Sequence, residues 1–241
     1  MIYESWLGAR GETALPLIIR TGASMRTCVY DRANVPGGMS DPAPAPRTSV
    51  DIANDLRAAL RQARIEPPYA LVGDSFGAMN AIVFAGQYPG DVVALALVEP
   101  LAPDALAAML RALPDPAPDE PADIERVRRR LTSLLTSNSE AIDIPASERQ
   151  VLRAARLADL PVIIVTANSP LRDWLPCDES TTAALEKVWR GQQRFYDGLS
   201  ANTRAIRVDA GHDILGDDAD TVSAALLDWV ANTGVRVVDT R

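Results

Sequence analysis

The chain has 241 residues, of which 47% are hydrophobic and 23% charged, as in a folded globular protein with a sizeable core. Its net charge of -8 disfavours a nucleic-acid partner, because nucleic-acid surfaces require clustered positive charge. Two cysteines make no disulfide framework, no apolar run approaches the ~20 residues of a membrane span, and the start lacks a secretory signal, so we expect a cytoplasmic protein with no membrane partner.

The N-terminal part of the chain mixes short helix and strand signals. A helix is possible over 12–20, and the apolar run 27–30 predicts a strand. After a loop rich in proline and glycine, Thr48 or Ser49 can cap a helix that continues at apolar helical spacing to residue 63.

The remaining signals predict a parallel sheet. Four apolar runs predict strands: 69–73, 92–98, 162–166 and 203–208. Three stretches predict helices: 78–87, 181–199 and 217–231. The alternation of strand and helix implies parallel pairing with crossover helices, which is the α/β class with helices flanking a mostly parallel sheet.

Residues 100–160 show a different sequence pattern, with many prolines, short stretches of helical periodicity and no strand signal. We therefore predict a core formed by 1–99 and 161–241, interrupted by a helical cap at 100–160. The cap contains a basic run at 126–130 among acidic residues. Such a mixed run is typical of a solvated helix face, with anion binding as the weaker alternative.

The segment 73–77, Gly-Asp-Ser-Phe-Gly, stands between a predicted strand and a predicted helix. A G-x-S-x-G sequence at a tight strand-to-helix turn exposes the serine hydroxyl, here that of Ser75. The glycines remove side chains where strand and helix crowd the turn, and the amide of Phe76 at the helix start can stabilise an oxyanion. The alternative is an ordinary turn with an incidental serine.

His212 is the only histidine of the chain. A histidine-based metal site is therefore nearly excluded, and any mechanism with a histidine base must use this residue. His212 follows the last predicted strand, so it can reach Ser75 at the carboxyl edge of the sheet. The alternative is a structural histidine, and we expect neither a metal nor a cofactor.

Four segments carry a resemblance to the α/β-hydrolase superfamily over nearly the whole chain. They are Glu-Ser-Trp-Leu-Gly at 4–8, Tyr-Asp-Arg-Ala at 30–33, Gly-Asp-Ser-Phe-Gly at 73–77, and Gly-His at 211–212. The resemblance implies Ser75 as nucleophile, His212 as base, and the amides of Phe76 and Leu7 as oxyanion donors.

The chain departs from the family pattern at two positions beside the nucleophile. Asp74 replaces the usual histidine, and Trp6 replaces the usual glycine of the oxyanion loop. A carboxylate next to the serine disfavours an anion unless it points away or is paired. We expect both residues at the substrate pocket.

Two carboxylates compete for the role of triad acid. Glu99 ends the strand after the serine, and Asp173 lies in the loop after the strand 162–166. We favour Glu99, whose backbone the following proline biases towards an extended conformation. Asp31 and Asp213 are more distant options, and the alternative for Glu99 is a helix-capping carboxylate at the surface.

We expect a carboxylesterase-like serine hydrolase that cleaves an ester or related acyl bond through an acyl-enzyme. Leucines of the cap mildly favour an apolar small-molecule substrate. The competing functions are a lactone or C–C bond hydrolase, a thioesterase or cyclase of a biosynthetic pathway, and a non-catalytic ligand-binding protein on the same scaffold.

Overall fold

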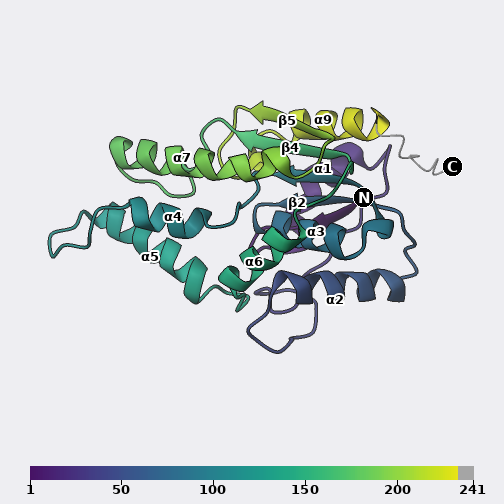
Figure 1. Ribbon diagram of the computed structural model, residues 1–241, viewed down its shortest axis with the longest axis horizontal. Helices are drawn as coiled ribbons and strands as arrows, with labels where there is room; N and C mark the ends of the chain where they lie inside the picture. The colour runs from purple at the N-terminus through teal and green to yellow at the C-terminus, as the bar shows by residue number, and fades with distance from the viewer. Residues whose placement is uncertain (233–241) are drawn as a thin grey trace.

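In the computed structural model, which describes residues 1–232, a parallel five-stranded sheet lies between layers of helices (Figure 1). The strands stand in the sheet in chain order: β1 (Ile2–Glu4), β2 (Tyr69–Asp74), β3 (Val92–Val98), β4 (Val162–Ala167) and β5 (Thr203–Val208). All neighbouring strands pair in parallel, so the predicted fold class is confirmed. The last part of the predicted core segment 161–241, from 233 onwards, lies outside the described residues.

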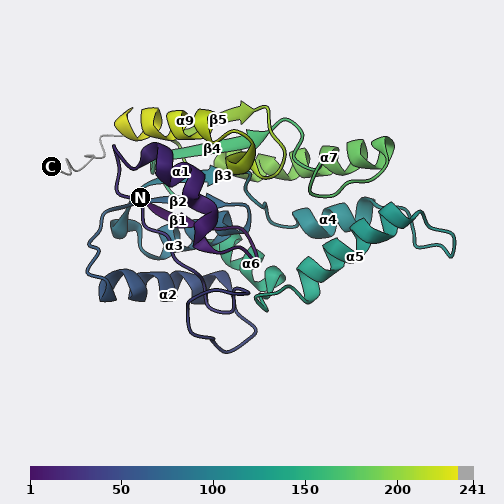
Figure 2. The ribbon, with the colours of Figure 1, turned by 180° about the vertical axis from the view of Figure 1, so that it is seen from behind.

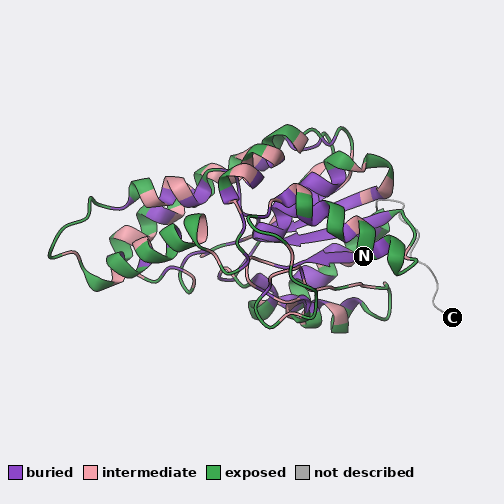
Figure 3. Ribbon diagram, turned by 90° about the horizontal axis from the view of Figure 1, so that it is seen from below, coloured by how far each residue is buried: buried purple, intermediate pink, exposed green. Residues whose placement is uncertain are grey.

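Alternation along the strands divides the interior into two apolar clusters, one on each face of the sheet. In β3, Leu95 and Leu97 belong to one cluster, whereas Ala96 and Val98 belong to the other. Successive side chains of a strand point to opposite faces, so an apolar run such as β3 is buried on both. The strands β1 to β4 accordingly form the buried centre of the molecule (Figure 3), whereas the edge strand β5 is buried only at Val208.

Helices cover both faces of this sheet (Figure 2). One face carries α2 (Ser49–Gln62), α3 (Phe76–Gln87) and α6 (Ile144–Ala154); the other carries α1 (Leu15–Thr21), the short α8 (Ile214–Asp217) and α9 (Ala219–Asn232). The carboxylate of Asp51 accepts hydrogen bonds from the backbone amide and the hydroxyl of Thr48, which fixes the start of α2 as its sequence predicts.

The segment 100–160 contains three helices and divides into two parts. Its first helices, α4 (Ala105–Ala112) and α5 (Ala122–Thr136), extend from the sheet together with α7 (Glu179–Gln193) (Figure 1). Its last helix, α6, packs against α3. Gly86 of α3 lies so close to Ala154 of α6 that a Cβ atom on Gly86 would contact Ala154. Of the helices in 100–160, α4 and α5 therefore project beyond the helix layers, whereas α6 belongs to one of these layers.

Some sequence predictions of local structure are wrong. Residues 27–30 form no strand, because only Cys28 meets the sheet, in an isolated bridge to Ile2. Three short 3-10 segments replace or extend predicted turns and helices: Gly11–Ala14, Pro89–Asp91 and Arg194–Gly198. Within residues 1–232, no helix is both long and apolar enough to cross a bilayer.

We predict that Gly77→Ala destabilises the fold by about 3 kcal/mol or more, because overpacking against rigid backbone cannot be relieved by side-chain motion. A Cβ at this position would overlap the backbone carbonyl of Glu4. Gly191→Ala on α7 is the matched control, since nothing lies near its Cβ position. Urea unfolding followed by circular dichroism measures both, and equal stabilities would contradict the close approach of β1 and α3.

Candidate active site

Ser75 occupies the turn between β2 and α3 with a strained backbone. Its φ is +52°, a conformation that non-glycine residues rarely adopt and that clusters at functional sites. The Ser75 amide donates to the carbonyl of Val98 at 2.9 Å, which fixes the turn to the end of β3. The Ser75 Oγ lies 3.1 Å from His212 Nε2. The structure thus brings together the two residues predicted as nucleophile and base.

Two tryptophans hold the His212 ring in place. The ring of Trp174 stacks on it, with centroids 4.3 Å apart and planes 14° apart, and Trp189 meets it edge to face at 5.7 Å. Burial, followed by the positive charge of Arg130, lowers the pKa of His212 to about 3. Within residues 1–232 the buried Nδ1 atom has no hydrogen-bond partner.

Glu99 does not make the predicted contact with His212. One carboxylate oxygen accepts from Trp189 Nε1 at 2.6 Å, and the other accepts from the backbone amide of Ala167. The residue is fully buried, and this burial raises its pKa to about 7. Glu99 therefore contacts Trp189, which in turn contacts His212. The expected direct hydrogen bond from Glu99 to the imidazole is not formed.

The backbone at Glu99 also differs from expectation. Its φ is +37°, not extended, although a proline follows. The amide of Glu99 donates to the carbonyl of Val165 at 2.7 Å, which ties this turn to β4. Strained residues thus end both β2 and β3 at the carboxyl edge of the sheet.

The other candidate acids also make no hydrogen bond to His212 in the described part of the chain. Asp173 is exposed and pairs with Arg172 at 3.6 Å. Asp31 accepts from the backbone amides of Gly11 and Met39, and Asp213 caps the start of α8. A hydrogen-bonded triad acid is absent from residues 1–232.

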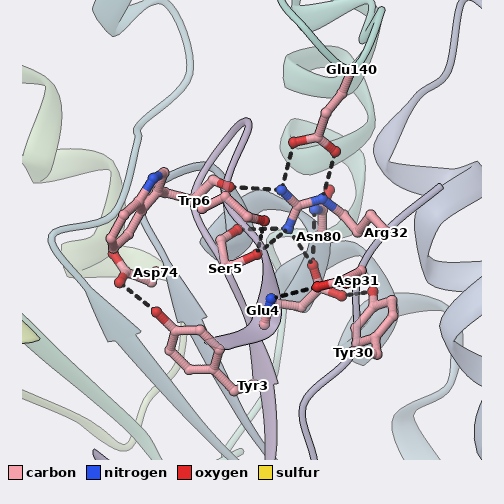
Figure 4. Close-up of polar contacts among 12 residues, drawn as sticks. Tyr3, Glu4, Ser5, Trp6, Tyr30, Asp31, Arg32, Asp74, Asn80 and Glu140 are labelled. Atoms are coloured by element: carbon pink, nitrogen blue, oxygen red, sulfur yellow. Dashed lines mark hydrogen bonds and ion pairs between the residues drawn. The ribbon is translucent and has the colours of Figure 1, made fainter. Parts of the chain in front are cut away.

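Asp74 is not at the substrate pocket, contrary to prediction. It is buried and accepts a hydrogen bond from the Tyr3 hydroxyl at 2.7 Å (Figure 4). Asp74 follows Ala70 and Val72 on the same face of β2, so its side chain points towards the cluster that contains Tyr3. Burial raises the pKa of Asp74 to about 7, against the opposite effect of the Tyr3 hydrogen bond.

A cavity of about 320 Å³ opens beside Ser75 and His212. Trp6, Leu7 and Phe76 line it next to the serine. The other lining residues are Leu101, Leu106, Arg130, Leu134, Asp173, Trp174, Asp213 and Asp217. The volume suits a small molecule, and the wall is largely apolar.

A buried arginine holds the loop that carries Trp6 and Leu7 (Figure 4). The Arg32 guanidinium donates to the carbonyl oxygens of Ser5 and Trp6, each at 2.7 Å. It also binds both carboxylate oxygens of Glu140, at 2.7 and 2.8 Å. Bidentate pairs of this kind fix geometry as well as charge.

Glu140 and Glu4 complete this buried network. Glu140, between α5 and α6, accepts from the amide of Gly8 at 2.5 Å, where the backbone has φ +82°. Glu4 accepts from Asn80 at 3.1 Å and lies 3.4 Å from Arg32. Burial raises the pKa of Glu4 to about 7, although Arg32 acts in the opposite direction.

Several residues of the site carry no signal in the sequence. Trp174, Trp189 and Glu140 stand in segments whose patterns predict only helix or loop. Arg32 belongs to a segment that matches the family, but no role follows from that match. Within residues 1–232, no cluster of three or more His, Cys, Asp or Glu side chains could hold a metal ion.

Comparisons with known proteins agree with this architecture. The family model described as alpha/beta hydrolase fold matches residues 24–142. The uncharacterized protein YqjL of Bacillus subtilis is 22% identical over 96% of this chain and 83% of its own length.

Two solved structures illustrate the likeness of fold. A thermophilic esterase from Thermogutta terrifontis has a TM-score of 0.63 at 16% identity, over 96% of this chain and 88% of that one. A hydrolase from Pseudomonas aeruginosa PA01 has a TM-score of 0.65 at 18% identity, over 95% and 88%. At such identities, each structure is similar in fold.

We predict that Asp74→Asn changes the pH dependence of stability. The folded-state pKa of Asp74 is raised from 3.8 to about 7, so its favourable contribution is present at low pH and is lost as pH rises through about 7. Asparagine does not titrate, so the free energy of unfolding of the variant does not decrease with pH for this reason. Urea unfolding at a series of pH values measures the difference between the two proteins.

The stability of Asp74→Asn relative to wild type should therefore increase as pH rises from about 4 to about 8. Asparagine keeps an acceptor for Tyr3, and the titrations of Glu4, Glu99 and His212 are common to both proteins. A difference that does not vary with pH would contradict the buried, perturbed state of Asp74.

Proposed function

Because the chain belongs to the α/β-hydrolase superfamily, we propose that it is a serine hydrolase that cleaves an ester or a related acyl bond through an acyl-enzyme. The single observation that carries this proposal is the 3.1 Å contact between Ser75 Oγ and His212 Nε2 at a cavity. The esterase from Thermogutta terrifontis supports the same reaction class.

The proposed mechanism begins with a neutral imidazole. The lowered pKa of His212 keeps the imidazole neutral, and in the tautomer that carries its hydrogen on Nδ1 the Nε2 atom accepts the Ser75 proton. The Ser75 oxygen then attacks the substrate carbonyl, and the amides of Leu7 and Phe76 stabilise the negative charge on the former carbonyl oxygen. His212 returns the proton to the leaving group, and a water molecule releases the acyl group from Ser75 by the reverse steps.

Two aromatic rings compensate for the missing acid in this proposal. The stacked indole of Trp174 stabilises the imidazolium that forms during the reaction, as cation–π contacts do. Glu99 acts at one remove, as a positioning residue that fixes Trp189 against the His212 ring. The reaction is therefore carried by a serine–histidine pair.

The helices α4 and α5 form the cap in this proposal. Leu106 of α4 and Leu134 of α5 line the cavity together with Leu101. The acyl chain of the substrate packs against these side chains, which favours an apolar portion in the substrate. The proposed cap is thus the part of 100–160 that projects from the helix layers.

The unpartnered Nδ1 of His212 favours a second candidate function. Without a charged partner the imidazole is a weaker base, so a non-catalytic ligand-binding protein on the same scaffold is the competing proposal. Such a protein would bind small molecules in the cavity but would leave Ser75 unreactive.

We predict that a fluorophosphonate probe labels Ser75, because His212 activates its hydroxyl. Ser75→Ala should abolish labelling, and it should lower kcat on p-nitrophenyl esters by several orders of magnitude while leaving the fold intact. His212→Ala should have a comparable effect on kcat. Mass spectrometry of the labelled peptide and steady-state kinetics provide the measurements; an unlabelled wild-type protein would favour the binding protein.

We also predict that Glu99→Gln lowers kcat by only about tenfold, far less than the roughly 10⁴ lost when an acid bonded directly to the imidazole is neutralised. Asp173 is the competing candidate acid and is exposed, so Asp173→Asn should change kcat by less than about threefold. Steady-state kinetics of both variants decide the assignment. A loss near 10⁴ in either would identify that carboxylate as a direct partner of His212 during turnover.

A further inference from the structure

The basic run of α5 does not form one uniform solvated face. Arg128 pairs with Glu120 at 2.5 Å, and Arg129 pairs with Glu125 one turn earlier at 3.3 Å. Arg130 instead lines the cavity beside Ser75. It shares this face of α5 with Leu134, one turn further along, which lines the same cavity.

Arg130 has no hydrogen-bond or ion-pair partner in the part of the chain that the structure describes, residues 1–232. The positive charge of Arg130 acts on His212, because it contributes to the lowering of the pKa of this residue. A guanidinium at a mostly apolar wall is a specific hydrogen-bond donor to a planar anion such as a carboxylate. Arg130 is exposed and lines the space that a substrate would occupy, so its guanidinium is available to a ligand there.

Three carboxylates also line the cavity, and each already has a partner. Asp173 pairs with Arg172 at 3.6 Å, Asp213 caps α8 through the Gly216 amide at 2.9 Å, and Asp217 accepts from the Gly211 amide at 2.7 Å. These contacts direct the carboxylates towards their own loops. Their negative charge nevertheless disfavours a multiply charged ligand, so a single negative charge matches this site best.

We propose that Arg130 binds a carboxylate at the far end of the substrate, so that the enzyme prefers acyl compounds with one anionic end and an apolar middle. The inference rests on the proposed serine-hydrolase function and names the substrate class of that site. The carboxylate lies at Arg130, the apolar chain lies along Leu106 and Leu134, and the scissile carbonyl lies at Ser75.

A bound carboxylate also has a consequence for the base. It neutralises Arg130, whose charge opposes protonation of His212, and so makes the imidazole a stronger base. Substrate charge is in this way coupled to the proton transfer from Ser75. The preference for an anionic substrate should therefore appear in kcat as well as in KM.

The test compares two phenyl esters with acyl chains of equal length, phenyl hexanoate and the phenyl hemiester of adipic acid. Wild type should show the higher kcat/KM on the adipate hemiester. Arg130→Gln should lower the ratio of the two kcat/KM values about tenfold or more, as expected when a hydrogen-bonded charge pair is lost. Arg130→Lys should restore part of the ratio, and Arg129→Gln is the matched control that should keep it.

A binding measurement separates this inference from the proposed function. In Ser75→Ala, calorimetry should detect tighter binding of monomethyl adipate than of dimethyl adipate, and Arg130→Gln added to that background should remove the difference. Anion binding without hydrolysis of any ester would overturn the proposed function and leave the Arg130 site standing.

Other outcomes would overturn the Arg130 inference itself. Hydrolysis of both esters with a ratio that Arg130→Gln does not change would exclude an anion subsite at Arg130. Faster turnover of the corresponding trimethylammonio-hexanoate ester than of the adipate hemiester would show that the carboxylates of the cavity determine specificity. Absence of both hydrolysis and monomethyl adipate binding would reject the subsite and the function together.

Discussion

The buried guanidinium of Arg32 is the interaction on which the geometry of this site depends. It joins Glu4 of β1 to Glu140 of the segment between α5 and α6, and it holds the carbonyl oxygens of Ser5 and Trp6. A charge in the interior is tolerated only when paired and fully hydrogen-bonded. The network satisfies this requirement, and in doing so it fixes the loop whose residues Trp6 and Leu7 line the cavity.

This network also joins the helical segment 100–160 to the core at a point beside the nucleophile. Glu140 contacts Arg32 and the amide of Gly8, while α6 immediately after it packs on α3. The helix that begins at Phe76 is therefore supported from the same segment that supports the loop carrying Trp6 and Leu7. The apolar core positions Ser75, and the polar network positions the groups that would act on its substrate.

The sequence predicts the parts of this arrangement that depend on local pattern. The strands β2 to β5 follow from apolar runs and α3 follows from its helical pattern, whereas β1 is not predicted; the meeting of Ser75 with His212 follows because parallel strands end at one edge of the sheet. The Glu99 contact is not predictable in this way, because Trp189 of α7 reaches Glu99 only through the packing of distant segments. The direction of Asp74, by contrast, follows from its alternation with Ala70 and Val72 along β2.

The distribution of tryptophans has an optical consequence. Of the four in the chain, Trp6 and Trp174 line the cavity and Trp189 touches His212, whereas Trp229 lies in the cluster on the opposite face of the sheet. Three of the four indoles thus lie at the cavity or against the His212 ring. Emission from these indoles reports occupancy of the cavity and the protonation of the imidazole without any attached label.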